Sequence, residues 1–199
     1  MTIRRAEIDR EITRLLARQS EFRAAADVVV AAWRAFPEVQ AIALIGSVAK
    51  PLRKEVPRFQ PFRRHGIELW HECGDLDLAV WLDSRDRLGD MRRARDLALR
   101  LACDSRTGIL VANHQVDTFL FEPGSDRYLG RLCSFAQCPK SKRDCLTPGC
   151  CAVPFNKVVE GFRPDYTLLA GAVPLYERAS GSTWRAADLP AAGDSLASA

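Results

Sequence analysis

Three aspartates on two short apolar stretches have the types and the spacing that could bind a metal ion. Asp75 and Asp77 flank Leu76, and Asp117 lies inside a later apolar stretch. Side chains alternate between the two faces of a strand, so Asp75 and Asp77 should point to the same side. Two carboxylates on one face repel each other unless a cation lies between them, and carboxylate oxygens suit Mg²⁺ or Mn²⁺. The pattern therefore predicts a metal-dependent site that transfers a phosphate-linked group.

A Gly-Ser step, Gly46-Ser47, follows an apolar run and adds a second feature to this site. Gly46 has no Cβ, so the backbone can approach a ligand closely. Ser47 offers a hydroxyl and a backbone N–H to which an anion can bind. A Gly-Ser pair after a strand is common in turns and by itself does not indicate a phosphate-binding site. It supports such a site here because the aspartates follow it.

A cluster of five cysteines, within positions 133–151, could bind a second metal. Their spacing is C-x4-C-x6-C-x4-C-C, and the stretch between them is polar and rich in loop-forming residues. Such a loop needs a cross-link to be ordered, and four thiolates around Zn²⁺ would provide one. The expected ligands are Cys133, Cys138, Cys145 and Cys150, with Cys151 as the alternative to Cys150. An iron–sulfur cluster and a set of reduced surface thiols are the other interpretations.

The apolar pattern predicts two helices within residues 1–36. Thr2 can cap the first helix, and Ser20 can cap a second one over Glu21–Phe36. Both segments carry apolar residues at helical spacing.

Three apolar strands are predicted to form the sheet that holds the site. They are expected at residues 39–45, 75–82 and 115–121. Asp77 lies inside an apolar strand, and a buried carboxylate needs a partner or an ion. A helix capped by Ser84 should follow the second strand and end near Cys103. Its predicted inward face is Leu88, Met91, Leu97 and Leu101.

Composition is that of an ordinary globular domain. The 199 residues are 47% hydrophobic and 27% charged, and the net charge of +4 does not by itself imply a nucleic-acid partner. The N-terminus has no apolar signal segment, and no stretch is long and apolar enough for a membrane span. We therefore expect a cytoplasmic protein without a membrane partner, in which the seven cysteines are thiols or metal ligands.

Residues 50–73 form a basic insertion between the Gly-Ser step and the paired aspartates. Six lysines and arginines lie within 50–64, interrupted by prolines and interleaved with aromatic residues. One interpretation is a loop over the site that binds a triphosphate or a nucleic-acid backbone. The other is a solvated surface loop, because charge runs are usually exposed.

The order of these motifs resembles the DNA polymerase β-like nucleotidyltransferase superfamily. The resemblance rests on a strand followed by Gly46-Ser47, on Asp75-Leu76-Asp77 at a strand, on Asp117 in a later strand, and on the closing segment 171–178. The resemblance extends over about residues 22–178. Its closing segment, 171–178, is similar to that of the minimal nucleotidyltransferase domains.

The predicted fold is α/β (α+β), with a small mixed β-sheet flanked by helices, an N-terminal helical pair and a metal-bound cysteine loop. The nucleotidyltransferase domain that the resemblance implies would occupy residues 1–178. Residues 179–199 are rich in Ala, Ser and Gly and are expected to be a mostly disordered tail.

The resemblance implies an activity and roles for the site residues. Asp75 and Asp77 would hold two Mg²⁺ ions, and Asp117 would share one of them and act as general base or orient the nucleophile. Gly46 and Ser47 would contact the β- and γ-phosphates. A nucleoside monophosphate would pass from an NTP, with ATP as first candidate, to a hydroxyl on a small molecule, a protein or an RNA end.

Two other functions stay open from the sequence. The first is a non-catalytic module that uses the same fold to bind nucleic acid or protein. The second is the antitoxin role of some minimal nucleotidyltransferases, which modify a partner protein.

Overall fold

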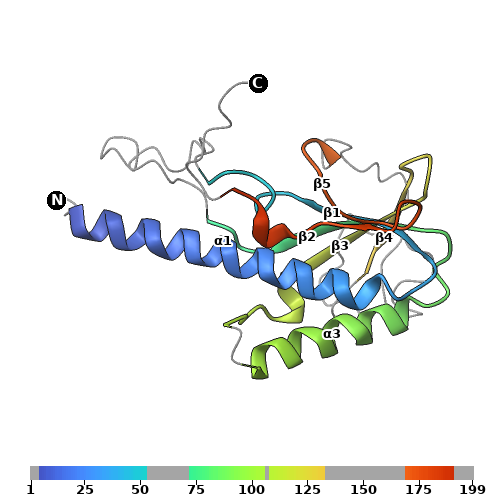
Figure 1. The fold of residues 1–199 in the computed structure, drawn as a ribbon, viewed down its shortest axis with the longest axis horizontal. Coiled ribbons are helices and arrows are strands. Elements are labelled where there is room, and N and C mark those ends of the chain that lie inside the picture. The colour runs from blue at the N-terminus through green and yellow to red at the C-terminus, as the bar shows by residue number, and fades with distance from the viewer. Residues whose placement is uncertain (1–4, 53–71, 106–107, 133–168, 191–199) are drawn as a thin grey trace.

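A mixed β-sheet with helices on one of its faces forms the described part of the chain (Figure 1). The structure is a computed structural model and describes residues 5–52, 72–105, 108–132 and 169–190. Its helical elements are α1 (Arg5–Trp33), α3 (Leu88–Asp104) and the 3₁₀ turns η2 (Asn113–Gln115) and η4 (Ala186–Asp188). Its strands are β1 (Val39–Ile45), β2 (Leu76–Leu82), β3 (Val116–Phe121), β4 (Tyr128–Arg131), β5 (Val173–Glu177) and β6 (Ser182–Thr183). The mixed helix-and-sheet class is confirmed, and the three predicted strands lie within one residue of their expected bounds.

The sheet has the strand order β4-β3-β2-β1-β5-β6. Strands β2 and β3 are parallel, and every other neighbouring pair in this sheet is antiparallel. A parallel pair needs a crossover connection, and α3 lies in that connection. Parallel pairing brings the first residues of β2 and β3 to the same edge of the sheet.

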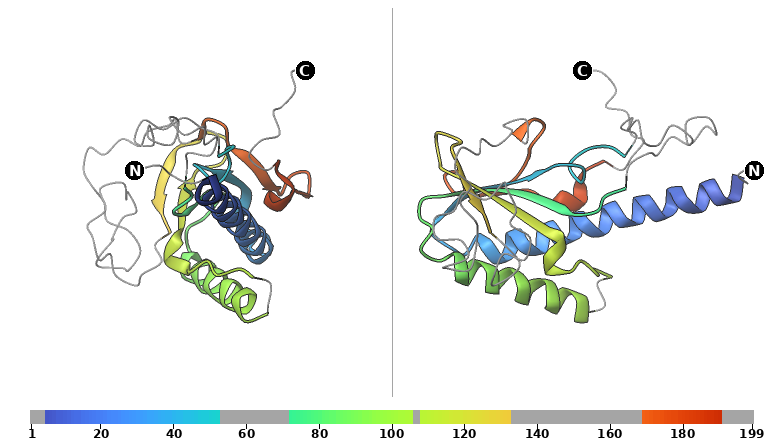
Figure 2. Two further views of the ribbon diagram at one scale, coloured as in Figure 1. Left: turned by 90° about the vertical axis from the view of Figure 1, so that its left-hand side faces the viewer. Right: turned by 180° about the vertical axis from the view of Figure 1, so that it is seen from behind.

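The two faces of the sheet have different cover. Helices α1 and α3 lie on one face, as the views in Figure 2 show, and Leu76, Leu78 and Val80 of β2 belong to the large core on that side. The other face carries a smaller cluster: Ala43, Ile45, Ala79, Phe119, Phe121 and Tyr128. Alternation along the strands places Asp77 and Asp117 on this second face, which we call the site face.

The N-terminal residues form one continuous helix and not the predicted pair. Helix α1 passes through Ser20 without a break. It contains no glycine or proline, and a serine inside a helix costs only about 0.5 kcal/mol, whereas a second helix needs a new nucleus. The buried side also continues across Ser20, from Leu15 through Gln19 to Phe22. The continuous buried face of the helix therefore favours one long helix, although Ser20 could cap a second one.

Helix α3 buries a different stripe from the predicted one. The buried residues are Leu88, Met91, Arg95, Leu99 and Ala102. Leu97 and Leu101, which the apolar pattern places inward, are 50% and 58% exposed. Arg95 can face inward because it pairs with Asp96 at 2.9 Å and donates to the Val116 carbonyl at 3.5 Å. The spacing of apolar residues in the sequence could not predict these polar contacts.

Part of the expected disordered tail belongs to the fold. Residues 179–190 contain β6 and η4, and Asp27 of α1 accepts hydrogen bonds from the backbone N–H groups of Ala186 (2.6 Å) and Ala187 (3.2 Å). A carboxylate that satisfies N–H groups at the start of a helical turn acts as its cap. The expectation of disorder is thus wrong for residues 179–190, and 191–199 lie outside the described residues.

Candidate functional site

The parallel pairing of β2 and β3 brings the three predicted aspartates together. Asp77 and Asp117 are direct partners in the register of the two strands, and Asp75 lies two residues earlier, just before β2. One carboxylate oxygen from each of the three lies within 4.8 Å of the others. Asp75 is exposed, whereas Asp77 and Asp117 are half-buried. The cluster therefore opens to solvent on the side of Asp75.

The backbone at Gly46 lies close to this cluster. It follows β1, whose last residue, Ile45, is the register partner of Asp77. Gly46 has φ +71°, and a Cβ placed on it would lie 3.1 Å from the carboxyl carbon of Asp77 and overlap one of its oxygens. Any side chain here would push Asp77 out of its place. The sequence pattern identified Gly46 as a close-approach residue, and the group that it approaches is the Asp77 carboxylate.

Helix α1 holds the loop that contains Gly46. Gln19 donates to the Lys50 carbonyl at 2.7 Å, and Arg23 donates through Nε to the Val48 carbonyl at 3.2 Å. Gln19 and Arg23 are both buried. Two carbonyls of a tight turn are thus fixed by side chains from the long helix, which restrains the loop beside the aspartates.

Ser47 has a partner inside the protein. Its side chain is hydrogen-bonded to the thiol of Cys73, which is 2% exposed. Burial raises the pKa of the Cys73 thiol, and the hydrogen bond with Ser47 acts in the opposite direction. The hydroxyl predicted to contact phosphates therefore contacts Cys73, and the loop's backbone N–H groups are the better candidates for binding an anion.

Arg131 is a residue of the site that the sequence argument missed. Its guanidinium forms an ion pair with Asp117 and lies 4.6 Å above the centre of the Phe119 ring. Arg131 is only 6% exposed, and it stands on β4 as the register partner of Phe119. A buried arginine fixed by a ring and a carboxylate holds that carboxylate in one orientation.

Several predicted features fall outside the residues that the structure describes. These are the five clustered cysteines, Cys133, Cys138, Cys145, Cys150 and Cys151, and residues 53–71 of the basic insertion. The zinc hypothesis and the role of the insertion stay predictions. The two cysteines within the described ranges are free: Cys73 is buried and Cys103 is exposed.

The donor set of the cluster fits a hard divalent cation. Three carboxylates supply oxygen ligands only, which Mg²⁺ and Mn²⁺ prefer over nitrogen or sulfur. The absence of a side chain at Gly46 leaves space for the Asp77 oxygen, and the ion pair with Arg131 restrains Asp117. Asp75, Asp77 and Asp117 are the residues that could hold such an ion.

Comparisons with family models, with curated proteins and with solved structures found no match to this chain. Within the described ranges, neither helix combines the length and the apolar character that crossing a membrane requires.

Proposed function

We propose that this protein is a Mg²⁺-dependent nucleotidyltransferase that transfers a nucleoside monophosphate from an NTP, with ATP as first candidate, to a hydroxyl acceptor. The observation that carries the proposal is the convergence of Asp75, Asp77 and Asp117 within 4.8 Å beside the turn at Gly46. The sequence resemblance points to the same activity, and it assigns these residues to the same site.

Each residue has a role in this proposal. The three aspartates hold Mg²⁺ or Mn²⁺, which neutralises phosphate charge and acidifies a hydroxyl when bound. The backbone of the turn at Gly46-Ser47 binds the outer phosphates through its N–H groups. Asp117, oriented by Arg131, accepts the proton of the acceptor hydroxyl.

The reaction is a displacement at the α-phosphorus of the NTP. The acceptor oxygen forms a bond to that phosphorus, the bond to the bridging oxygen of the β-phosphate breaks, and pyrophosphate leaves. The hydroxyl proton goes to Asp117, so atoms and charges balance. Nothing in this step requires an oxidant or a further substrate.

Substitution of Asp77 tests the proposal in two assays. Asp77→Asn removes the charge but keeps the shape, and we expect Mn²⁺ affinity measured by electron paramagnetic resonance to fall at least about tenfold. Mg²⁺-dependent transfer of the label from α-³²P-labelled NTPs to RNA, protein or polyol acceptors should fall at least about a hundredfold.

Asp104→Asn is the matched control, because Asp104 is exposed at the end of α3. It should leave both Mn²⁺ binding and transfer unchanged. Wild-type Mn²⁺ affinity or full transfer activity in Asp77→Asn would contradict the proposal.

A further inference from the structure

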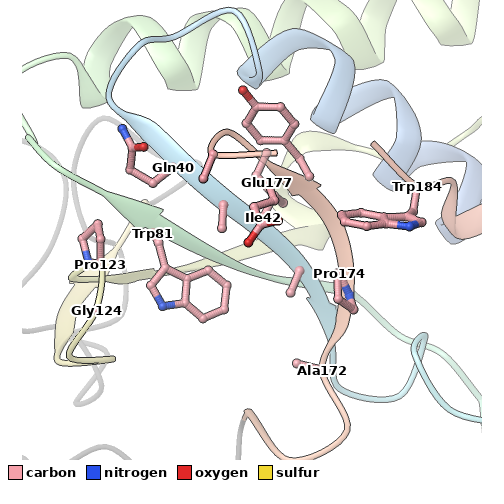
Figure 3. A pocket seen from close by; sticks show the side chains of 13 residues that line it. Gln40, Ile42, Trp81, Pro123, Gly124, Ala172, Pro174, Glu177 and Trp184 are labelled. Carbon is pink, nitrogen blue, oxygen red and sulfur yellow. The ribbon is translucent and has the colours of Figure 1, made fainter. Parts of the chain in front are cut away.

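A pocket of about 610 Å³ lies over β1 and β5 (Figure 3). The small residues of its lining, which we call the floor, include Ala41 and Ala43 of β1 and Pro174 of β5. Figure 3 shows Trp81 and Trp184 on opposite sides of β1. Ala43 belongs to the apolar cluster of the site face, and Trp81 packs against that cluster. The volume is in the range of small-molecule sites.

The indole of Trp81 is held in one orientation. Its Nε1–H donates to Asp126 at 2.6 Å, and its ring stacks on Phe121 with the centroids 5.5 Å apart and the planes 30° apart. An aromatic wall that is fixed before a ligand arrives loses little conformational entropy on binding. Trp184, on the other side, is 45% exposed.

The pocket begins close to the aspartates. Ile45 is the register partner of Asp77, and Ala43 lies two residues before Ile45 on β1, which is a distance of about 7 Å. Trp81 lies four residues from Asp77 along β2, or about 13 Å. A ligand whose phosphate meets the carboxylates can therefore place a ring against Ala43 and Trp81, with a sugar between them.

The charge of the lining favours an uncharged ring over a phosphate. Among the described residues that line the pocket there is no lysine or arginine, and Glu177 adds a carboxylate to the lining. Aromatic side chains bind bases by stacking, because every base has a π-face. A carboxylate at the edge can accept hydrogen bonds from an amino or imino group of the same ring.

We infer that this pocket holds the base of the donor nucleotide, with the ring between Trp81 and the Ala41–Ala43 floor and its edge toward Glu177. The assignment to the donor rests on the proposed function. The base binds without the metal and without phosphates, because the pocket offers stacking and hydrogen bonding only.

Calorimetric titration of the full chain with adenosine in EDTA tests this inference. We expect measurable binding that weakens about tenfold or more in Trp81→Ala, which removes the stacking wall, and in Ala41→Phe, which occupies the floor. Leu101→Ala, on the exposed side of α3, is the control and should bind as wild type does. Circular dichroism shows whether each variant is folded. Adenosine that does not bind to the wild type, or that binds equally well to folded Ala41→Phe, overturns the inference.

Two further titrations test whether the bound ring is the base of the donor nucleotide and whether the pocket prefers a base to another aromatic ring. ATP in EDTA should compete with adenosine, and simultaneous binding would overturn the assignment to the donor. Indole should bind at least tenfold more weakly than adenosine, and equal affinity would overturn the specificity for a base.

Asp77→Asn separates this inference from the proposed function. It should lose Mn²⁺ affinity and transfer but bind adenosine as wild type does. If transfer proves absent from the wild type while Trp81→Ala still weakens adenosine binding, the proposed function fails and the pocket remains a base-binding site. If transfer is Asp77-dependent but adenosine binding is independent of Trp81, only the pocket assignment fails.

Discussion

Gly46 shows how a single residue without a side chain can define the candidate site. Two separate features of the structure favour glycine at position 46. One is the positive φ of the backbone, and the other is the lack of room for a Cβ beside the Asp77 carboxylate. Gly181 shares the positive φ, at +68°, but nothing lies within 4 Å of the position its Cβ would take. The two glycines therefore allow the effects of the two features to be measured separately.

We expect Gly46→Ala to be much more harmful than Gly181→Ala. Both substitutions carry the cost of a positive φ, about 1 kcal/mol, measured as the free energy of unfolding in urea. Gly46→Ala also displaces Asp77, so Mn²⁺ affinity should fall at least about tenfold, whereas Gly181→Ala should keep it. Equal Mn²⁺ affinity in the two variants would show that the contact does not constrain Asp77.

Arg131 marks the limit of residue-level prediction from the sequence. The aspartates could be found because carboxylates at alternating positions in an apolar strand are unusual, and Gly46 because it directly follows a strand. Arg131 is one basic residue in a short strand, and only its register with Phe119 brings it to Asp117. That register depends on a turn and a bulge between β3 and β4, which the residue pattern does not reveal.

At the scale of elements, α1 connects the turn beside the aspartates to the C-terminal segment. Arg23 is 4% exposed and donates to three carbonyls: Val48 at 3.2 Å, Leu189 at 2.9 Å and Pro190 at 3.0 Å. Burial lowers the pKa of Arg23. A single side chain on one helix thus satisfies carbonyls from two segments that are far apart in the sequence.

Replacing Arg23 should destabilise the fold and loosen the turn. Arg23→Met keeps much of the side-chain length but leaves three carbonyls without this donor, and we expect a loss of about 2–4 kcal/mol in the free energy of unfolding. Arg18→Met is the control on the same helix, because Arg18 forms a partly buried ion pair with Glu21, and its cost should stay below about 1 kcal/mol. A similar cost for both variants would mean that the Arg23 contacts contribute little.

The elements themselves were predictable to different degrees. The strand at 39–45 was found because a continuous apolar run between Pro37 and Gly46 has few alternatives. The N-terminal helices were predicted as two because Ser20 resembles a cap, and the one-helix outcome depends on a buried stripe that includes Gln19. Polar residues such as Gln19 and Arg95 enter the core only because tertiary partners exist for them, and sequence spacing does not show those partners.

For the whole molecule, the sheet order decides what lies on the site face. Helices α1 and α3 cover one face, and the aspartates, Arg131 and the pocket share the other. The sequence predicted the alternation that puts Asp75 and Asp77 on one side of a strand, and the family resemblance alone joined Asp117 to them. The sequence did not predict that β5 pairs with β1, which brings Pro174 beside Ala43 and forms the pocket. Pairings between strands far apart in the chain depend on long-range packing.

The stability of the whole molecule should depend on pH through its ion pairs. Hydrogen bonds from Arg127 and Ser125, at the turn between β3 and β4, lower the pKa of Glu122 from 4.5 to about 2. A carboxyl whose pKa is lower in the folded state stabilises the fold when it is ionised. This contribution is complete above about pH 4.5 and is lost as the pH falls toward 2. For Asp27, burial raises the pKa, so its contribution has the opposite sign.

Urea unfolding between pH 6 and pH 2.5 measures the Glu122 contribution. The wild-type free energy of unfolding should decline as the pH falls below 4.5, and Glu122→Gln should decline less steeply because it has no proton to bind there. Arg127→Gln should lessen the slope in a similar way, since Arg127 and Glu122 are 2.6 Å apart. The double variant should then add little to either single one. A wild-type slope retained in Glu122→Gln would assign the acid sensitivity to other carboxylates, and additive effects would show that the two side chains act independently.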